Sequence, residues 1–298
     1  MILRSPEMLL YLTFCLFNAL LYTAIKLFSV NLGISTLVLA SYMNLMVFIL
    51  YNIFFFKRIW RNRLYFNVIK VRNLFLSASV ISALTKMYCI QYIEPRDAVI
   101  IAHTTPLMVM LFASIFLKEK MIPKYWIYGA LSLVGVMIYV WKKIDLNSFY
   151  YLILLLHVLF KATMHIATKN ASKHSVFDVL FYDNLFYSIF AICFLSITTH
   201  QIDYTFFFKW QILLLVVITT ISLFGLVKAY SLAQNGITKL QNLDFSKILF
   251  SMILAALFLN DEITTNEATG AGIILLSIVL SQVNLEGFIS RKLSKSAK

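Results

Sequence analysis

Long runs of apolar residues, separated by short polar segments, make up nearly the whole chain. A helix needs about 20 apolar residues to cross a bilayer, and it must pair its backbone polar groups within itself. The pattern therefore predicts an all-α polytopic membrane protein, without the alternation that is typical of barrel strands. Ten transmembrane helices are predicted, at residues 8–28, 35–56, 74–93, 97–117, 124–141, 149–168, 176–198, 210–233, 238–259 and 267–285.

The polar ends of the fourth and ninth predicted helices resemble each other. Glu119 lies in FLKEK and is followed ten residues later by Gly129, while Glu262 ends FLNDE and is followed ten residues later by Gly272. A shift of 143 residues relates both pairs, and it also aligns Lys26 with Lys169, Leu37 with Leu180, Leu111 with Leu254 and Val136 with Val279. We therefore expect one unit used twice, at residues 1–143 and 144–289, followed by a basic tail at 290–298.

Composition agrees with a membrane protein, because 61% of the 298 residues are hydrophobic and 13% are charged. In soluble domains about 45–50% of the residues are apolar and about 25% are charged. The net charge of +13 would suit a nucleic-acid partner, but most basic residues lie in the short connections between apolar runs, so no such partner is expected. With the N-terminus inside, 17 Lys and Arg residues fall in cytoplasmic segments and four outside, which favours a multi-pass inner-membrane protein with both termini cytoplasmic.

Each predicted unit holds an odd number of helices, so the second unit enters the membrane from the opposite side. The fold expected is therefore ten transmembrane helices arranged as two inverted five-helix repeats. Inverted repeats are a recurring plan in secondary transporters, whose substrate site lies near the bilayer midplane between the two halves.

These motifs resemble the drug/metabolite transporter superfamily, in particular its EamA-type ten-span transporters. The resemblance rests on FLKEK with Gly129, FLNDE with Gly272, Pro106 in the fourth helix, and the lysines that close the first and sixth helices. It covers nearly the whole chain and implies a transporter of small metabolites with a central cavity lined by both halves. It does not imply a particular substrate. Many relatives carry an Arg in the second helix, where this chain reads LASYMNLM at 39–46, so contacts of that Arg are not carried over.

Ionisable side chains inside the predicted helices are the candidates for substrate binding, because each costs about 2.5–3.5 kcal/mol to insert unless it faces a cavity or a partner. His157, Lys161 and His165 are spaced four apart and share a helix face, which favours either a pathway stripe or groups satisfied by neighbouring helices. Asp244 and Lys247 suit a structural ion pair better than a proton-coupling site. The full set of substrate-binding candidates is Lys86, His103, His157, Lys161, His165, Lys228, Asp244 and Lys247.

Other ionisable groups carry weaker expectations. Lys26 lies near a helix end, where it can reach the interface, and Asp183 counts as a second intramembrane acid. Glu119 and Glu262 fall on opposite sides of the membrane in the expected topology, so they suit helix capping rather than a catalytic pair. No metal site, cofactor or catalytic residue is expected, since the chain has no DxxD, HExxH or Gly-rich phosphate loop.

The function these features favour is secondary transport of a small metabolite, such as an amino acid, a nucleotide or a cofactor like S-adenosylmethionine, by alternating access. Five Lys against two Asp inside the helices favour a solute with a carboxylate or phosphate, and protons are a candidate coupling ion. Export of metabolites or drugs is the alternative. A membrane-embedded enzyme is less favoured, because the chain lacks clustered acids. A channel or a non-transporting scaffold is less favoured too: a scaffold would not need the central lysines Lys86, Lys161 and Lys228, and a channel would show no counterflow.

Overall fold

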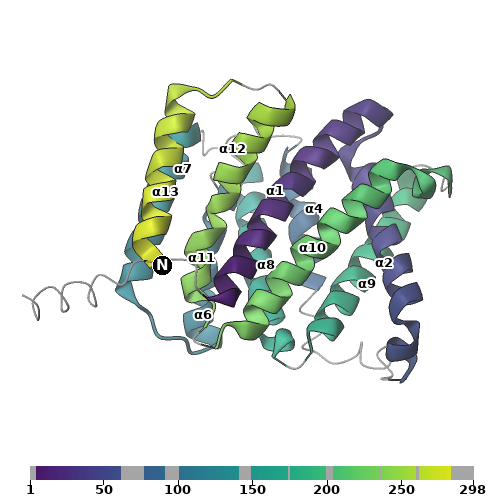
Figure 1. Cartoon of the computed structure of the whole chain (residues 1–298), viewed down its shortest axis with the longest axis horizontal. Coiled ribbons are helices and arrows are strands. Elements are labelled where there is room, and N and C mark those ends of the chain that lie inside the picture. Colours follow the sequence, from purple (N-terminus) through teal and green to yellow (C-terminus); the bar gives the residue numbers. More distant parts are fainter. Residues whose placement is uncertain are drawn as a thin grey trace, which may run out of the picture.

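A computed structural model describes residues 5–61, 77–90, 101–140, 149–173, 175–198, 204–234, 236–259 and 262–282, with side chains undescribed at 59–61, 86–90, 204 and 259. Within these ranges the regular structure is helical (Figure 1). The elements are α1 (Pro6–Leu32), α2 (Thr36–Arg61), α4 (Ala78–Ile90), α6 (Thr105–Phe116), α7 (Pro123–Val140), α8 (Phe149–Ser172), α9 (Val176–Thr198), η3 (Tyr204–Phe208), α10 (Trp210–Leu232), α11 (Thr238–Asp244), α12 (Ser246–Leu259) and α13 (Thr265–Gln282).

Six of the described segments are long and apolar enough to cross a membrane. They are Pro6–Leu32, Thr36–Arg58, Phe149–Ser172, Val176–Thr198, Trp210–Leu232 and Thr238–Phe258. A shorter apolar helix covers Thr105–Phe116. Large apolar side chains lie on the outside of the bundle, such as Phe54 at 76% and Leu257 at 69% exposure, which is the surface that a lipid environment requires. The protein is therefore a multi-pass membrane protein; crossing by the remaining predicted helices stays a prediction.

Helix packing repeats between the two halves. Helix α1 packs on α10 and α12, while α8, its counterpart at the 143-residue shift, packs on α4 and α6. The remaining main contacts join α2 to α9 and α7 to α13, and in each of these two pairs one helix is the counterpart of the other at the same shift. Exchanging the halves therefore leaves these main contacts unchanged. In Figure 1, α7 and α13 lie side by side at one end of the bundle, and α2 and α9 lie at the other.

Glycine allows the closest of these approaches. A methyl group added to Gly270 in α13 would meet the backbone of Gly135 and Tyr139 in α7, so no larger residue fits without moving the helices apart. The motif glycines differ from each other. Gly129 lies against Leu107 and Met110 of α6, whereas Gly272 faces open space. The symmetry of these two positions in sequence is thus not matched by symmetry in packing.

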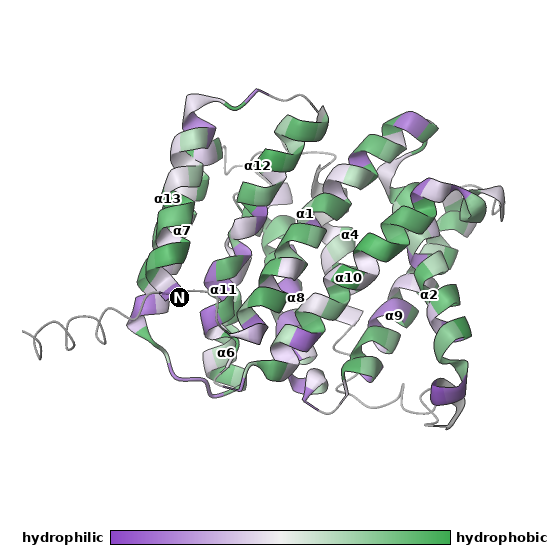
Figure 2. Ribbon diagram, in the orientation of Figure 1, coloured by the Kyte–Doolittle hydropathy of each residue, from purple (hydrophilic) through white to green (hydrophobic). Residues whose placement is uncertain are grey.

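The ninth predicted helix is interrupted. It consists of α11 and α12, which meet at a turn at Phe245, with a backbone bond from the Ile248 amide to the Phe245 carbonyl. In the first half, Ala102 corresponds to Phe245 at the 143-residue shift, and it is followed by a turn at His103 and Thr104 before α6 begins. Figure 2 shows the helices as largely hydrophobic along their lengths, with hydrophilic residues at the ends and within α8, α9 and α11. Interrupted helices near polar residues are a common way for transporters to form a binding site.

Candidate functional site

A cavity lies between helices of the two halves. Its volume is about 160 Å³, and its lining comes from α1, α2 and α4 of the first half and from α8, α9 and α10 of the second half. This volume lies below the roughly 300–1,000 Å³ of pockets for drug-sized ligands, so it suits a small solute. The polar residues of the lining are Asn18, Tyr22, Asn44, Ser79, Lys161, Thr168, Asp183, Asn184, Tyr187, Thr219 and Ser222.

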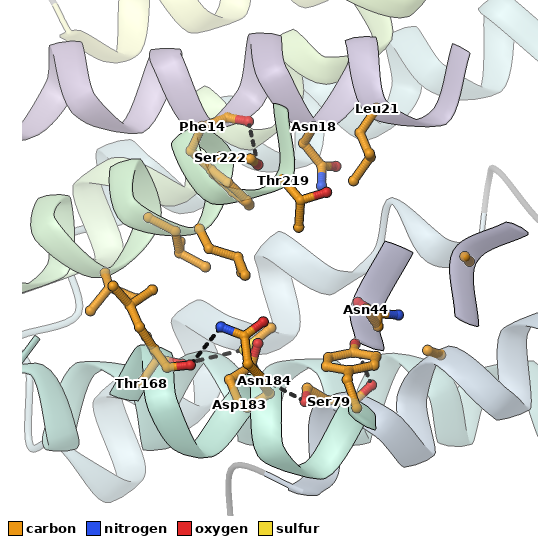
Figure 3. Close-up of a pocket in the computed structure, with 18 of the residues that line it drawn as sticks. Phe14, Asn18, Leu21, Asn44, Ser79, Thr168, Asp183, Asn184, Thr219 and Ser222 are labelled. Carbon is orange, nitrogen blue, oxygen red and sulfur yellow. Dashed lines mark hydrogen bonds between the residues drawn. The ribbon is translucent and has the colours of Figure 1, made fainter. Parts of the chain in front are cut away.

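One wall of the cavity carries an acid. The Ser79 hydroxyl of α4 donates a hydrogen bond of 2.8 Å to Asp183 Oδ1 of α9, and the Tyr187 hydroxyl donates to the Ser79 carbonyl at 3.1 Å. Asn184 follows on the same helix, and its side-chain amide donates to the Leu180 carbonyl. The Ser79 hydroxyl thus ties the Asp183 carboxylate to α4, and Tyr187 makes a second contact between α9 and α4, so Asp183 is held at the cavity wall (Figure 3).

The facing wall presents neutral polar groups. Figure 3 shows Asn18 of α1 and Thr219 and Ser222 of α10 opposite Asp183. The Ser222 hydroxyl donates to the Phe14 carbonyl at 3.4 Å, and Thr219 contacts the sulfur of Met43. The side chains of Asn18 and Asn44 form no hydrogen bond with the part of the chain that the structure describes. Their amides are therefore free to bind a solute.

Lys161 is the cation of the cavity. It lies in the middle of α8 and lines the cavity, and it forms no ion pair or hydrogen bond with any residue in the described ranges. Tyr22 and Asp183 are among the groups whose charges or dipoles act on its ammonium group. A central lysine of this kind cannot reach the membrane interface, so it needs water or a ligand in the cavity.

The two histidines of α8 and its second lysine, Lys169, are satisfied by neighbouring parts of the protein. The His157 ring lies 2.8 Å from Ser82 Oγ of α4, and the His165 ring lies 2.6 Å from the Tyr230 hydroxyl of α10. Lys169 donates to the Tyr230 and Ala233 carbonyls at 2.7 and 2.6 Å. The three residues spaced four apart therefore differ: Lys161 faces the cavity, whereas His157 and His165 contact neighbouring helices.

Asp244 and Lys247 form the ion pair that their spacing predicts. Lys247 Nζ lies 2.6 Å from Asp244 Oδ1, and the Tyr11 hydroxyl donates to the same carboxylate oxygen at 2.9 Å. The ammonium group also lies 4.3 Å from the Phe14 ring centre. Tyr11 stacks on Tyr230, whose hydroxyl accepts a bond from Gln241, so the pair belongs to a closed network.

The remaining candidates lie outside the cavity lining. His103 lies in the turn before α6, with its ring centre 6.5 Å from that of Phe245. Lys228 lies on α10, and Lys26 is exposed near the end of α1. The side chain of Lys86 is outside the described residues. Whether any of these residues binds substrate stays a prediction.

Glu119 caps a helix of the opposite half, which confirms the capping role expected for it. Its carboxylate accepts bonds from the Ile237 and Thr238 amides at 2.9 and 3.1 Å and from the Thr238 hydroxyl at 2.7 Å, at the start of α11. Gly236 precedes this cap with a φ of 96°, and a side chain there would collide with Glu119. The position of Glu262 is exposed.

Sequence reasoning missed the amides of the cavity. Asn18, Asn44 and Asn184 lie within apolar runs, and their polarity there was the available signal. Asp183 was recognised only as an intramembrane acid. Among the described residues, no group of three or more His, Cys, Asp or Glu side chains could hold a metal ion.

Comparison with known proteins places this architecture in a family. A profile described as the EamA-like transporter family matches residues 5–141 and 148–282, with one match in each half of the chain. The pseudopaline exporter CntI of Pseudomonas aeruginosa, found in two strains, is 34% identical over 98 residues, covering 32% of this chain and 34% of the exporter. The match thus spans about a third of the length of these curated relatives.

A protein of known crystal structure shares the fold. The superposition has a TM-score of 0.70, with 14% sequence identity, and covers 94% of this chain and 99% of the other. An identity this low supports the architecture and carries no information on substrate. The profile matches both halves of the chain, and the chain therefore belongs to the EamA-like transporter family.

Proposed function

We propose that the chain is a secondary transporter that moves a small metabolite through the cavity between its halves by alternating access. The single observation that carries this proposal is the cavity itself, whose lining comes from three helices of each half. A solute held there contacts both halves at once, so rocking of one half against the other would open it to either side of the membrane.

The proposed membrane arrangement is ten transmembrane helices in two inverted five-helix repeats, with both termini in the cytoplasm and the chain in the inner membrane. The packing pattern supports it, because α1 with α10 and α12 corresponds to α8 with α4 and α6. The distribution of Lys and Arg supports the orientation. Insertion of cysteines into the connections, followed by labelling of intact cells, tests this topology.

Export of a metabolite is the direction that the relatives favour, because the curated proteins that match are named as exporters of pseudopaline. The match covers a third of each chain, so it supports the direction and the general class of solute only. Carriers run in both directions when gradients are reversed, and the assay below therefore measures exchange rather than net export.

Counterflow in proteoliposomes tests the proposal. Purified full-length chain is reconstituted, vesicles are loaded with amino acids, nucleotides or S-adenosylmethionine, and uptake of the labelled solute is followed. Asn18→Trp fills the cavity and should abolish exchange, while Leu257→Trp, at a position 69% exposed on the outer surface, should retain it. Exchange that survives Asn18→Trp would contradict a pathway through this cavity.

A further inference from the structure

The two halves of the chain contribute unequal charges to the cavity, although the 143-residue shift relates several of their lining positions. The 143-residue shift aligns Ser79 with Ser222, and both line the cavity. The same shift aligns Asn18 with Lys161 and Ala40 with Asp183, and all four of these residues line it as well. The second half therefore supplies one cation and one anion at positions where the first half supplies an amide and a methyl group.

These two charges differ from the two ion pairs in the described ranges. Lys247 pairs with Asp244 at 2.6 Å, and Lys239 pairs with Glu7 at 2.7 Å. Lys161 and Asp183 line one cavity and attract each other electrostatically, yet no ion pair joins them and neither has another ionic partner in those ranges. Buried charges are normally paired, so the missing partners must enter with the solute or its water.

From this arrangement we infer that the cavity binds a zwitterionic solute of the amino-acid type, with Lys161 facing its carboxylate and Asp183 facing its cationic group. This inference rests on the proposed transport function and names the substrate class of that site. A zwitterion carries no net charge and provides each buried group with a partner of opposite sign. Binding would therefore leave the pathway electrically neutral in the occupied state.

Solutes of other charge fit the cavity less well. A simple anion would match Lys161 and be repelled by Asp183, and a simple cation would do the reverse. A neutral solute would leave both charges without partners. The rest of the lining suits the backbone and side chain of an amino acid: the Asn18 and Asn44 amides are available for hydrogen bonds, and Leu21, Met43 and Leu226 form an apolar wall.

Ligand binding by the purified chain tests the charge requirement apart from transport. The chain in detergent is titrated with leucine, methionine, phenylalanine and serine, each as the free amino acid, the N-acetyl derivative and the amide, and stabilisation against heating is recorded. At least one free amino acid should bind at least about tenfold more tightly than both of its blocked forms, as expected when one close charge pair is removed. The same compounds then compete in the counterflow assay.

Two variants assign the charges to their partners. Asp183→Asn should reduce the preference for the free amine over the N-acetyl form to under about threefold while keeping the preference for carboxylate over amide. Lys161→Gln should reduce the preference for carboxylate over amide and keep the preference for the free amine over the N-acetyl form. A merely structural role would weaken all three forms equally. The matched controls are Asp178→Asn on α9 and Lys173→Gln just after α8, neither of which lines the cavity.

The possible outcomes separate the inference from the proposed function. Charge-selective binding without exchange would support the zwitterion site and contradict transport of these solutes. Exchange that prefers blocked, anionic or neutral solutes would support transport and overturn the zwitterion site. Binding by no free amino acid, or variants that leave both preferences unchanged, would also overturn it, as would a preference lost equally in Asp178→Asn.

Discussion

Two lysines on α8, two turns apart, show how differently this membrane protein uses the same residue type. Lys169 is 4% exposed, and its ammonium group donates to the Tyr230 and Ala233 carbonyls at the end of α10. It thus binds carbonyls at the C-terminal end of a helix, where the last carbonyls have no partner within the helix. Lys161 lines the cavity and has no such partner in the described ranges. One lysine holds two helices together, and the other is available to a solute.

The two buried acids differ in the same way. Asp244 accepts bonds from Lys247 and Tyr11 and lies in a closed network between α1, α11 and α12. Asp183 accepts a bond from Ser79 and faces the cavity. The lesson is that an intramembrane charge is not by itself evidence for a binding site. The informative property is whether protein groups already satisfy that charge.

The largest effect on stability is expected from Asp244→Ala. The substitution leaves Lys247 charged and without its partner in a buried position, which typically costs about 3–5 kcal/mol. The free energy of unfolding, or the midpoint of thermal unfolding in detergent, should fall accordingly. Asp183→Asn is the matched comparison, and it should leave the midpoint nearly unchanged. Equal losses in the two variants would contradict the distinction between satisfied and open acids.

Lys169→Met sharpens the comparison of the lysines. Methionine keeps much of the apolar stem but removes both hydrogen bonds to the α10 carbonyls, so the expected loss is about 1–3 kcal/mol. Lys161→Met should cost nothing or raise stability slightly, because it removes a buried charge without breaking an ion pair. Thermal unfolding in detergent measures both, with exposed Lys173→Met as the control. A larger loss from Lys161→Met than from Lys169→Met would reverse our assignment.

Glu119→Ala tests the contact that crosses between the halves at the start of α11. It removes an acceptor shared by the Ile237 and Thr238 amides, and losing a cap of this kind costs about 0.5–2 kcal/mol. Lys120→Ala changes an exposed neighbour and should have no effect. Hydrogen exchange should then increase at the first turn of α11 while α8 and α9 stay protected. Unchanged exchange there would mean that the cap does not hold this turn.

The helices could be predicted from the sequence, whereas their interruption could not. Each predicted range overlaps a described helix, because apolar runs of this length leave few other structures in a membrane. The break at Phe245 has no glycine or proline at the turn to announce it. The short helix η3 was missed as well, since Tyr204–Phe208 is an apolar segment too short to show periodicity.

Neighbouring helices decide which members of the α8 stripe are open, and the sequence does not give that information. Four residues turn an α-helix by one full turn plus about 40°. The face therefore rotates from His157, which meets α4, through Lys161, which meets the cavity, to Lys169, which meets α10. The spacing in the sequence places these residues on one side of the helix, but only the packing of the neighbouring helices shows which of them reaches the cavity.

The smallest change in exchange that we predict is a partial recovery, expected when the open charge is moved within the cavity after its removal. Lys161→Gln should lower exchange of a zwitterionic solute at least about tenfold, which corresponds to about 1.4 kcal/mol. Asn18 is the repeat-related position on the facing wall, so adding Asn18→Lys to this variant restores one cation to the cavity. The double variant should recover exchange by about threefold over Lys161→Gln, since the carboxylate regains a partner at a less suitable angle. Asn18→Gln in the Lys161→Gln background controls for side-chain size. If exchange recovers with Asn18→Gln, or does not recover with Asn18→Lys, then the solute depends on a property of Lys161 other than its charge.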